Sequence, residues 1–153
     1  MEAVHWKIKS FIELSGTELY EILKIRQQVF VVEQACYYLD ADGYDDKAIH
    51  LWAEQNGEIL AYCRIFDAGI KYQEASIGRV LTNPNYRNLR LGKILVKFAL
   101  LTIEARFRAA GVRISAQDYL LRFYSEFGFN DTGKKYLEDD IPHTEMLKSS
   151  RAI

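Results

Sequence analysis

The segment at residues 77–92 combines residue types that bind anions. Arg87 and Arg90 follow a strand-like run and precede a helical pattern that begins at Leu91. The N-terminus of a helix presents unpaired N–H groups and the positive end of the helix dipole, so this order of elements is suited to phosphate. Residues 83–135 hold ten Lys and Arg and four Asp and Glu, a local net charge of 10 − 4 = +6. The segment predicts an anion site, with a solvated basic face as the alternative.

Two acidic segments, 40–46 and 138–140, lie outside this basic region. Carboxylates gathered in a loop attract cations, so Asp40 and Asp42 are candidates for holding a positively charged acceptor. The alternative is a solvated loop. On this charge pattern we expect a small-molecule or peptide amine as partner, and a cationic one.

The elements that position these residues follow from spacing and turn chemistry. A Ser-Gly-Thr-Glu capping box predicts a helix over residues 15–28. The Asn-Gly pair at 56–57 predicts a hairpin, because a type I′ turn needs positive φ at both central positions. Helical spacing predicts a long helix from Leu91, with Gly111 as its C-cap. The other expected elements are strands at Trp6–Phe11, Ile49–Gln55, Glu58–Phe66, Ala75–Thr82, Val112–Ala116, Phe129–Lys135 and His143–Lys148, a short helix at Asp118–Phe127, and a loop at Tyr136–Pro142.

Composition narrows the class of protein. The chain has 153 residues, 49% of them hydrophobic, and a net charge of −1, which predicts one folded α/β domain over residues 1–153. The small net charge argues against a nucleic-acid partner, and no apolar run is long enough for a membrane helix. The first residues lack a signal-peptide pattern, and Cys36 and Cys63 make no disulfide framework, so a cytoplasmic protein is expected. Metal-binding, P-loop and dinucleotide-binding spacings do not occur in the sequence, so we expect no metal.

Several separated motifs agree in order and spacing across residues 5–148. The basic loop, the long helix and Phe-Tyr-Ser-Glu-Phe-Gly-Phe at 123–129 resemble the GNAT N-acetyltransferase superfamily. Four further segments are similar to the ElaA-like branch of this superfamily: Val-Phe-Val-Val-Glu-Gln at 29–34, Tyr-Leu-Asp-Ala-Asp-Gly at 38–43, Ile-Gly-Arg-Val at 77–80 and Glu-Asp-Asp-Ile-Pro-His at 138–143. The resemblance implies a single GNAT-type domain, with a mixed, mostly antiparallel sheet of six or seven strands flanked by helices on both faces. It also implies transfer of an acetyl group from acetyl-CoA, a co-substrate, to a primary amine by direct attack.

The resemblance also implies which residues bind the donor. The basic loop would cradle the pyrophosphate, the backbone N–H of Val80 would stabilise the oxyanion, and the next residues would pair with the pantetheine arm. The loop departs from the family pattern because Asn88 and Arg90 replace glycines, which narrows the allowed backbone angles. The Arg90 side chain either adds charge toward phosphate or blocks the donor. The implied donor-binding residues are Val80, Leu81, Thr82, Arg87, Asn88, Leu89, Arg90, Leu91, Gly92 and Gln117.

Aminolysis of a thioester needs a base for the amine and an acid for the leaving thiolate. By resemblance Tyr124 is the acid that stands near the sulfur; the alternative is a buried structural tyrosine. Glu33 is one candidate base because it follows an apolar run, although it could pair with Arg26, a charge on an apolar helix face. His143 is another, because histidine titrates near neutral pH. A water chain with no dedicated base is a third possibility.

Two other functions stay open at this stage. Arg90 in the phosphate loop motivates a non-catalytic acyl-CoA-binding or regulatory module. The Arg-x-x-Val-Phe run at residues 26–30 and the acidic loop are similar to acyl-homoserine-lactone synthases, although the chain is short for one. A cysteine nucleophile lacks a supporting constellation of residues. A homodimer is expected by family analogy alone.

Overall fold

The computed structural model describes residues 3–149 of the chain. Its strands and helices follow one another in an α/β order that agrees with the expected class. The strands are β1 His5–Ser10, β2 Ile49–Gln55, β3 Glu58–Phe66, β4 Ser76–Thr82, β5 Gly111–Gln117, β6 Asn130–Glu138 and β7 Ile141–Ser149. The helices are α1 Gly16–Arg26, α2 Leu91–Arg106 and α3 Leu121–Ser125, with a π-helix, η2, at Gln27–Glu33 and short 3₁₀ helices η1 Phe11–Glu13, η3 Asp45–Lys47, η4 Pro84–Leu89 and η5 Asp118–Leu120.

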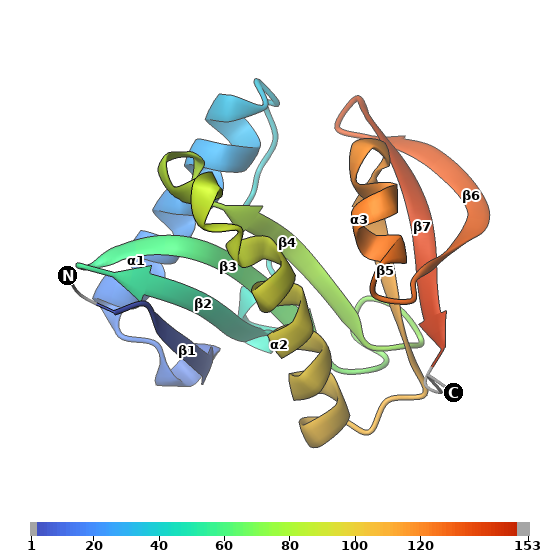
Figure 1. Ribbon diagram of the computed structural model, residues 1–153, viewed down its shortest axis with the longest axis horizontal. Coiled ribbons are helices and arrows are strands. Elements are labelled where there is room, and N and C mark those ends of the chain that lie inside the picture. The colour runs from blue at the N-terminus through green and yellow to red at the C-terminus, as the bar shows by residue number, and fades with distance from the viewer. Residues whose placement is uncertain (1–2, 150–153) are drawn as a thin grey trace.

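The strands form two antiparallel sheets, in the orders β1-β2-β3-β4 and β5-β7-β6 (Figure 1). One parallel bridge, between Ala75 and Val112, connects them where β4 begins. The Arg113 N–H donates a hydrogen bond of 2.9 Å to the Ala75 carbonyl at this point. Beyond the bridge, no pairing between β4 and β5 joins the described residues of the two sheets. The two strands diverge toward their C-terminal ends.

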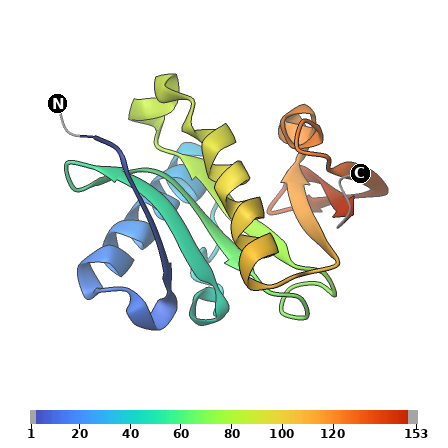
Figure 2. The same cartoon turned by 60° about the horizontal axis from the view of Figure 1, so that its bottom comes forward.

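Alternating residues of β2 and β3 pack against helices on opposite faces of the four-stranded sheet. Leu51 and Cys63 pack in a core that includes the buried residues of α2. Trp52 and Tyr62 pack in a second core, which contains the buried apolar residues of α1 and η2. Figure 2 shows α1 and α2 on opposite sides of this sheet. The expected arrangement, a mostly antiparallel sheet with helices on both faces, is therefore confirmed, as two sheets joined by a single bridge.

A β-bulge reorients β4 in its middle. The pairing of β3 with β4 passes from Tyr62 opposite Leu81 to Arg64 opposite Gly78, so one residue of β3 faces two of β4. Arg79 lies in the bulge with a positive φ of 49°. An extra residue in a strand bends it and turns the following side chains to the other face.

The expected helix over residues 15–28 continues further than the capping pattern indicated. Ser15 caps α1 as expected, accepting from the Glu18 N–H at 3.0 Å. After Arg26 the chain widens into the π-helix η2, and the Gln34 N–H still donates to the carbonyl five residues earlier. Short π-helical segments occur frequently at functional sites.

Two other expectations about local structure are wrong. The helix α2 ends at Arg106, and Gly111 is the first residue of β5 rather than a C-cap. A Cβ at Gly111 would lie 3.0 Å from the Lys148 carbonyl oxygen, so close strand pairing explains this glycine. The expected loop at 136–142 is a tight hairpin between β6 and β7, because Asp139 and Asp140 adopt φ values of 51° and 63°. Aspartate tolerates this left-handed region better than most residues.

A buried cluster of charges joins α1, β3 and β4 to the acidic loop. Arg26 is fully buried, and its guanidinium donates to Asp40 at 2.8 Å and to Asp45 at 2.6 Å. Arg79 donates to the other oxygen of Asp40 at 2.8 Å. The arginine–aspartate cluster consists of Arg26, Arg64, Arg79, Asp40, Asp42 and Asp45.

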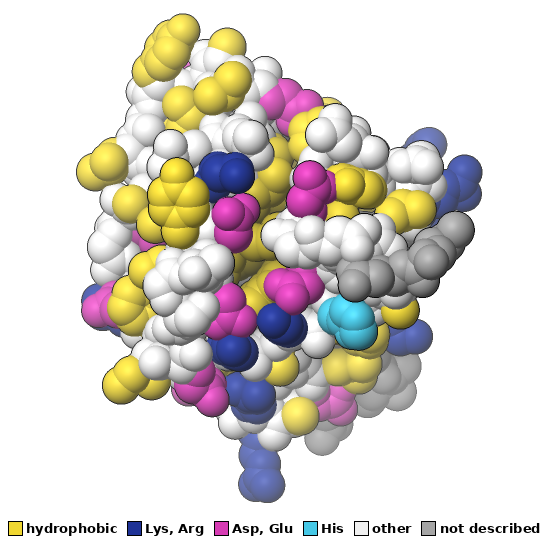
Figure 3. Space-filling view, turned by 90° about the vertical axis from the view of Figure 1, so that its left-hand side faces the viewer, with side chains coloured by type: hydrophobic (Ala, Val, Ile, Leu, Met, Phe, Trp, Pro, Cys, Tyr) yellow, Lys and Arg dark blue, Asp and Glu magenta, His cyan; other side chains and the backbone are white. Residues whose placement is uncertain are grey.

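The outer surface on the side at the left of Figure 1 mixes charges of both signs. Figure 3 shows acidic, basic and apolar side chains interspersed on this face. Lys7 and Lys9 on β1 form ion pairs with Glu18, and Lys7 also pairs with Glu54 at 2.8 Å. Among the described residues, no helix is both long and apolar enough to cross a membrane.

We expect Arg26→Met to lower the free energy of unfolding by about 3–5 kcal/mol, because it leaves the carboxylates of Asp40 and Asp45 with only one of their two arginine partners. Denaturant unfolding of the purified chain measures the change. Arg122→Met, at an exposed residue of α3, is the matched control and should change stability by about 0.5 kcal/mol or less. Equal stability of the two variants would contradict a stabilising role for this ion pair.

The free energy of unfolding should also depend on pH through the arginine–aspartate cluster. Burial raises the pKa of Asp42, but hydrogen bonds from Arg64 more than reverse this, so the pKa lies below its ordinary value. Burial also opposes ionisation of Asp45, and hydrogen bonding to Arg26 again leaves its pKa lowered. In acid the unfolded chain binds more protons than the folded one, so this stability is present above about pH 4 and is lost as the pH falls further. Unfolding midpoints at decreasing pH should show the loss, with a shallower decrease in Asp42→Asn.

Candidate active site

A cavity of about 1000 Å³ lies where β4 and β5 diverge. Its walls come from β4, β5, η2, α3, the start of α2 and the turn between β6 and β7. The structure brings nine of the residues proposed from the sequence to this one cavity: Glu33, Val80, Leu81, Thr82, Arg87, Gly92, Gln117, Tyr124 and His143.

The other proposed donor-binding residues lie beside the cavity, not in its wall. Asn88 and Leu89 end the 3₁₀ helix η4, so the expected open loop is a short helix. Arg90 is the N-cap of α2 and has a φ of 54°, a left-handed conformation that glycine adopts without strain. Its side chain is exposed and does not line the cavity. Leu91 packs in the core, so only its backbone is available to a ligand.

Arg90 therefore does not fill the cavity. This removes the observation that motivated a purely non-catalytic module. The N-terminus of α2 is also accessible to a ligand because Gly92 has no side chain. A Cβ there would lie 3.7 Å from Thr82 and from Phe123, in contact with both walls.

Arg87 and Glu33 form an ion pair across the entrance from η4 to η2. The guanidinium donates two hydrogen bonds to the carboxylate, at 2.9 and 2.7 Å. These bonds raise the pKa of Arg87. The alternative in which Glu33 pairs with Arg26 is wrong, because Arg26 binds the aspartates of the acidic loop.

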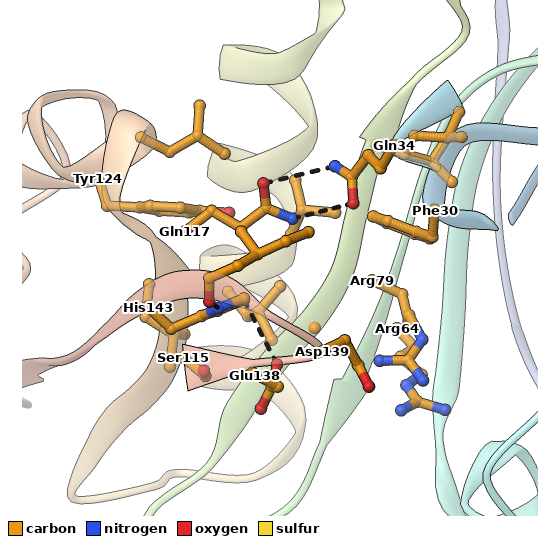
Figure 4. A pocket seen from close by; sticks show the side chains of 18 of the residues that line it. Phe30, Gln34, Arg64, Arg79, Ser115, Gln117, Tyr124, Glu138, Asp139 and His143 are labelled. Atoms are coloured by element: carbon orange, nitrogen blue, oxygen red, sulfur yellow. Dashed lines mark hydrogen bonds and ion pairs between the residues drawn. The ribbon is translucent and has the colours of Figure 1, made fainter. Parts of the chain in front are cut away.

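Tyr124 extends from α3 into the cavity, as Figure 4 shows. Its side chain is buried, and the rings of Phe123 and Phe129 contact it edge-on, with centroids 5.2 and 5.9 Å away. Burial raises the pKa of the phenol well above its ordinary value, so the hydroxyl stays protonated at neutral pH. Tyr124 is thus a rigidly held proton donor at the cavity wall.

His143, on β7, lies on the same side of the cavity as Tyr124 (Figure 4). Its Nδ1 lies 2.7 Å from the Ile141 carbonyl oxygen, which accepts only, so Nδ1 carries the hydrogen. Its Nε2 lies 3.4 Å from the Glu138 carboxylate. The ring stacks on Tyr136, with centroids 6.1 Å apart. His143 is therefore held with its basic nitrogen directed to Glu138 and the cavity (Figure 4).

Gln117 at the end of β5 binds a residue that the sequence analysis did not single out. Gln34 and Gln117 exchange two amide hydrogen bonds, of 3.4 and 3.3 Å, across the cavity (Figure 4). Gln34 belongs to the Val-Phe-Val-Val-Glu-Gln motif, so the resemblance was the signal that could have indicated it.

Asp40 and Asp42 neither hold a ligand nor form a solvated loop, which corrects both expectations. Their carboxylates are occupied by arginines of the cluster. Two of those arginines, Arg64 and Arg79, line the cavity themselves. The available signal for Arg64 was its charge within the otherwise apolar run at 59–66.

Another histidine and the two cysteines are placed as follows. His50 is buried, between the Tyr62 hydroxyl at 2.8 Å and the Asp45 carbonyl at 2.9 Å, and is structural. Cys63 is buried in the core, and burial raises the pKa of its thiol. Cys36 lines the cavity and donates to the Asp139 carbonyl. Within residues 3–149, no group of three or more His, Cys, Asp or Glu side chains is arranged to hold a metal ion.

Comparison with known proteins agrees with this geometry. The chain matches the acetyltransferase (GNAT) domain family over residues 22–150. It is 38% identical over 145 residues to a UPF0039 protein of Synechocystis sp., covering 94% of each chain. The crystal structure of an acyl-CoA N-acyltransferase from Pseudomonas aeruginosa has a TM-score of 0.89 and 37% identity, covering 96% of this chain and 100% of that one. The crystal structure of Escherichia coli ElaA has a TM-score of 0.89 and 34% identity, with the same coverage.

The fold is also similar to that of an AHL synthase, LasI. The TM-score is 0.74 at 14% identity, which shows a shared fold and nothing about activity. The family match and the near-complete relatives carry more weight, because they cover most of the chain at identities that indicate common descent. The chain belongs to the GNAT acetyltransferase family, among the relatives of ElaA.

Proposed function

We propose that the protein is an acyl-CoA-dependent N-acyltransferase that moves the acetyl group of acetyl-CoA to a primary amine by direct attack. Family membership supports acyltransferase activity with an acyl-CoA donor. The observation that carries the proposal is that a protonated, buried Tyr124 and the Nε2 of His143 face the same cavity. An acid and a base on one cavity are what thioester aminolysis requires.

The residues present fit an acyl-CoA donor. Its diphosphate would lie at the N-terminus of α2, where N–H groups and the helix dipole favour an anion and Gly92 leaves room. Arg87 would add a charge-assisted hydrogen bond there after leaving Glu33. The pantetheine arm would follow Leu81 and Thr82 along β4, with Gln117 facing it from β5.

In the proposed transfer, the residues named account for each proton that moves. The neutral amine nitrogen attacks the thioester carbonyl carbon, and its proton passes to His143 Nε2. Bulging of β4 at Arg79 directs the backbone at Val80 out of the regular ladder, and the Val80 N–H would donate to the oxyanion. The carbon–sulfur bond then breaks, and the Tyr124 hydroxyl donates its proton to the thiolate.

His143 suits the base role better than Glu33. Glu33 binds Arg87 through both carboxylate oxygens, and in this proposal it holds Arg87 until the donor binds. His143 has one nitrogen fixed by the Ile141 carbonyl and the other available. Tyr124 and His143 are therefore the acid and base of the proposal, and the acceptor is a small-molecule or peptide amine.

Tyr124→Phe should lower kcat about 100-fold or more while leaving acetyl-CoA binding unchanged, because it removes the proton donor and keeps the ring packing. Release of free CoA thiol measures turnover, and calorimetry with acetyl-CoA measures binding. Tyr20→Phe, at an exposed tyrosine of α1, is the matched control and should behave as the wild type. Near-normal kcat in Tyr124→Phe would remove the acid role.

Arg87→Gln should weaken CoA binding about tenfold or more, because a charged hydrogen bond to phosphate is lost. Glu33→Gln should act in the opposite direction, since it releases Arg87 from its ion pair. Calorimetric titration with CoA compares the two variants with the wild type. If Glu33→Gln instead lowers kcat and leaves CoA affinity unaltered, Glu33 is the base and the assignment to His143 fails.

A further inference from the structure

We propose that the acceptor amine carries a carboxylate, as in an amino acid, and that Arg64, Arg79 and Lys71 bind this carboxylate. This inference rests on the proposed acyl transfer and adds the chemical class of the acceptor. It follows from the two unlike walls of the cavity. Figure 4 shows Arg64 and Arg79 on one side of it and Glu138 and His143 on the other.

The basic wall has hydrogen-bond donors that the protein itself does not use. Arg64 is 2% exposed and lines the cavity, and its Nε is the one buried side-chain N or O atom without a hydrogen-bond partner among the described residues. A buried N–H on a charged group without a partner is costly. Among the residues that the structure describes, the hydrogen bonds of Arg79 use Nε and Nη2, and none involves Nη1. A carboxylate is the group whose two oxygens match such donors.

The charges of this wall do not cancel. Four cations, Arg26, Arg64, Arg79 and Lys71, meet the three carboxylates Asp40, Asp42 and Asp45. Lys71 lies at the edge of the cluster, with its Nζ 3.9 Å from Asp42 and 4.1 Å from the centre of the Tyr44 ring. One positive charge is left over, on the side that faces the cavity.

The ionisation of Lys71 depends first on its burial and then on neighbouring charges of both signs. Burial lowers the pKa of Lys71, and the charges of Arg64 and Arg79 lower it further, against the opposing effect of Asp42. A bound carboxylate would stabilise the charged lysine.

The opposite wall suits the amine. Glu138 and the Nε2 of His143 are two acceptors 3.4 Å apart. An ammonium or amine group beside these two atoms would donate to the carboxylate and to the unprotonated form of Nε2. The amine would then lie next to His143, on the side of the cavity that Tyr124 also lines. The carboxylate of the acceptor would point to Arg64.

Binding of reaction products tests the carboxylate separately from turnover. The probes are a panel of N-acetyl amino acids with apolar, polar, acidic and basic side chains, each paired with its N-acetyl amino acid methylamide, which lacks the carboxylate. Titration of the full chain in the presence of CoA should show at least one acid that binds about tenfold or more tightly than its methylamide, because the methylamide leaves the buried donors unpaired.

Two variants and one control assign the effect to the basic wall. Lys71→Gln and Arg64→Lys should each reduce the preference for the acid; if Arg64→Lys does not fold, Lys71→Gln decides, since Lys71 is exposed. Lys47→Gln is the matched control, because Lys47 also lies over the Tyr44 ring, at 5.5 Å, but does not line the cavity. The control should keep the full preference.

The outcomes separate this inference from the proposed function. Equal binding of acids and methylamides, tighter binding of methylamides, or no binding of any probe overturns the carboxylate subsite. A preference that survives Lys71→Gln unchanged also overturns it. Acetyl-CoA turnover with the parent amino acids and their amides is measured in parallel: release of no CoA with any amine refutes the acyltransferase proposal, whichever acid preference the titrations give.

Discussion

The site depends on the ion pairs that Arg26, Arg64 and Arg79 make with the acidic loop. These three arginines come from α1, β3 and β4, and their shared carboxylates tie the loop at 40–46 to all three elements. Each charge is buried or half-buried, so its partner is indispensable. The cluster holds η2 on one side of the cavity and the bulged part of β4 on another.

The cavity itself follows from incomplete pairing between the two sheets. Only the bridge at Ala75 and Val112 connects β4 with β5 in the described chain, and the strands diverge from there. The bulge at Arg79 and the π-helix η2 both depart from regular geometry beside this opening. Such departures change which side chains and backbone groups face the gap, so the irregular elements gather where a substrate would bind.

The two walls of the cavity divide its chemistry. The β5–β7 side, with α3, holds a protonated phenol and an imidazole whose tautomer the Ile141 carbonyl sets. The β3–β4 side holds guanidinium groups whose hydrogen bonds to aspartate leave some donors over. In the proposed reaction, proton transfer would take place on the β5–β7 side, and the carboxylate of the acceptor would bind on the β3–β4 side.

The sequence by itself determined the local elements and the family, because capping boxes, the Asn-Gly turn and the spaced motifs act within short segments. It also indicated nine of the residues that line the cavity. Tertiary structure alone decided their partners. Glu33 binds Arg87, 54 positions away, and Gln34 binds Gln117, 83 positions away. Such pairings between distant segments depend on where a strand bulges and where the two sheets separate, and no short sequence pattern specifies that geometry.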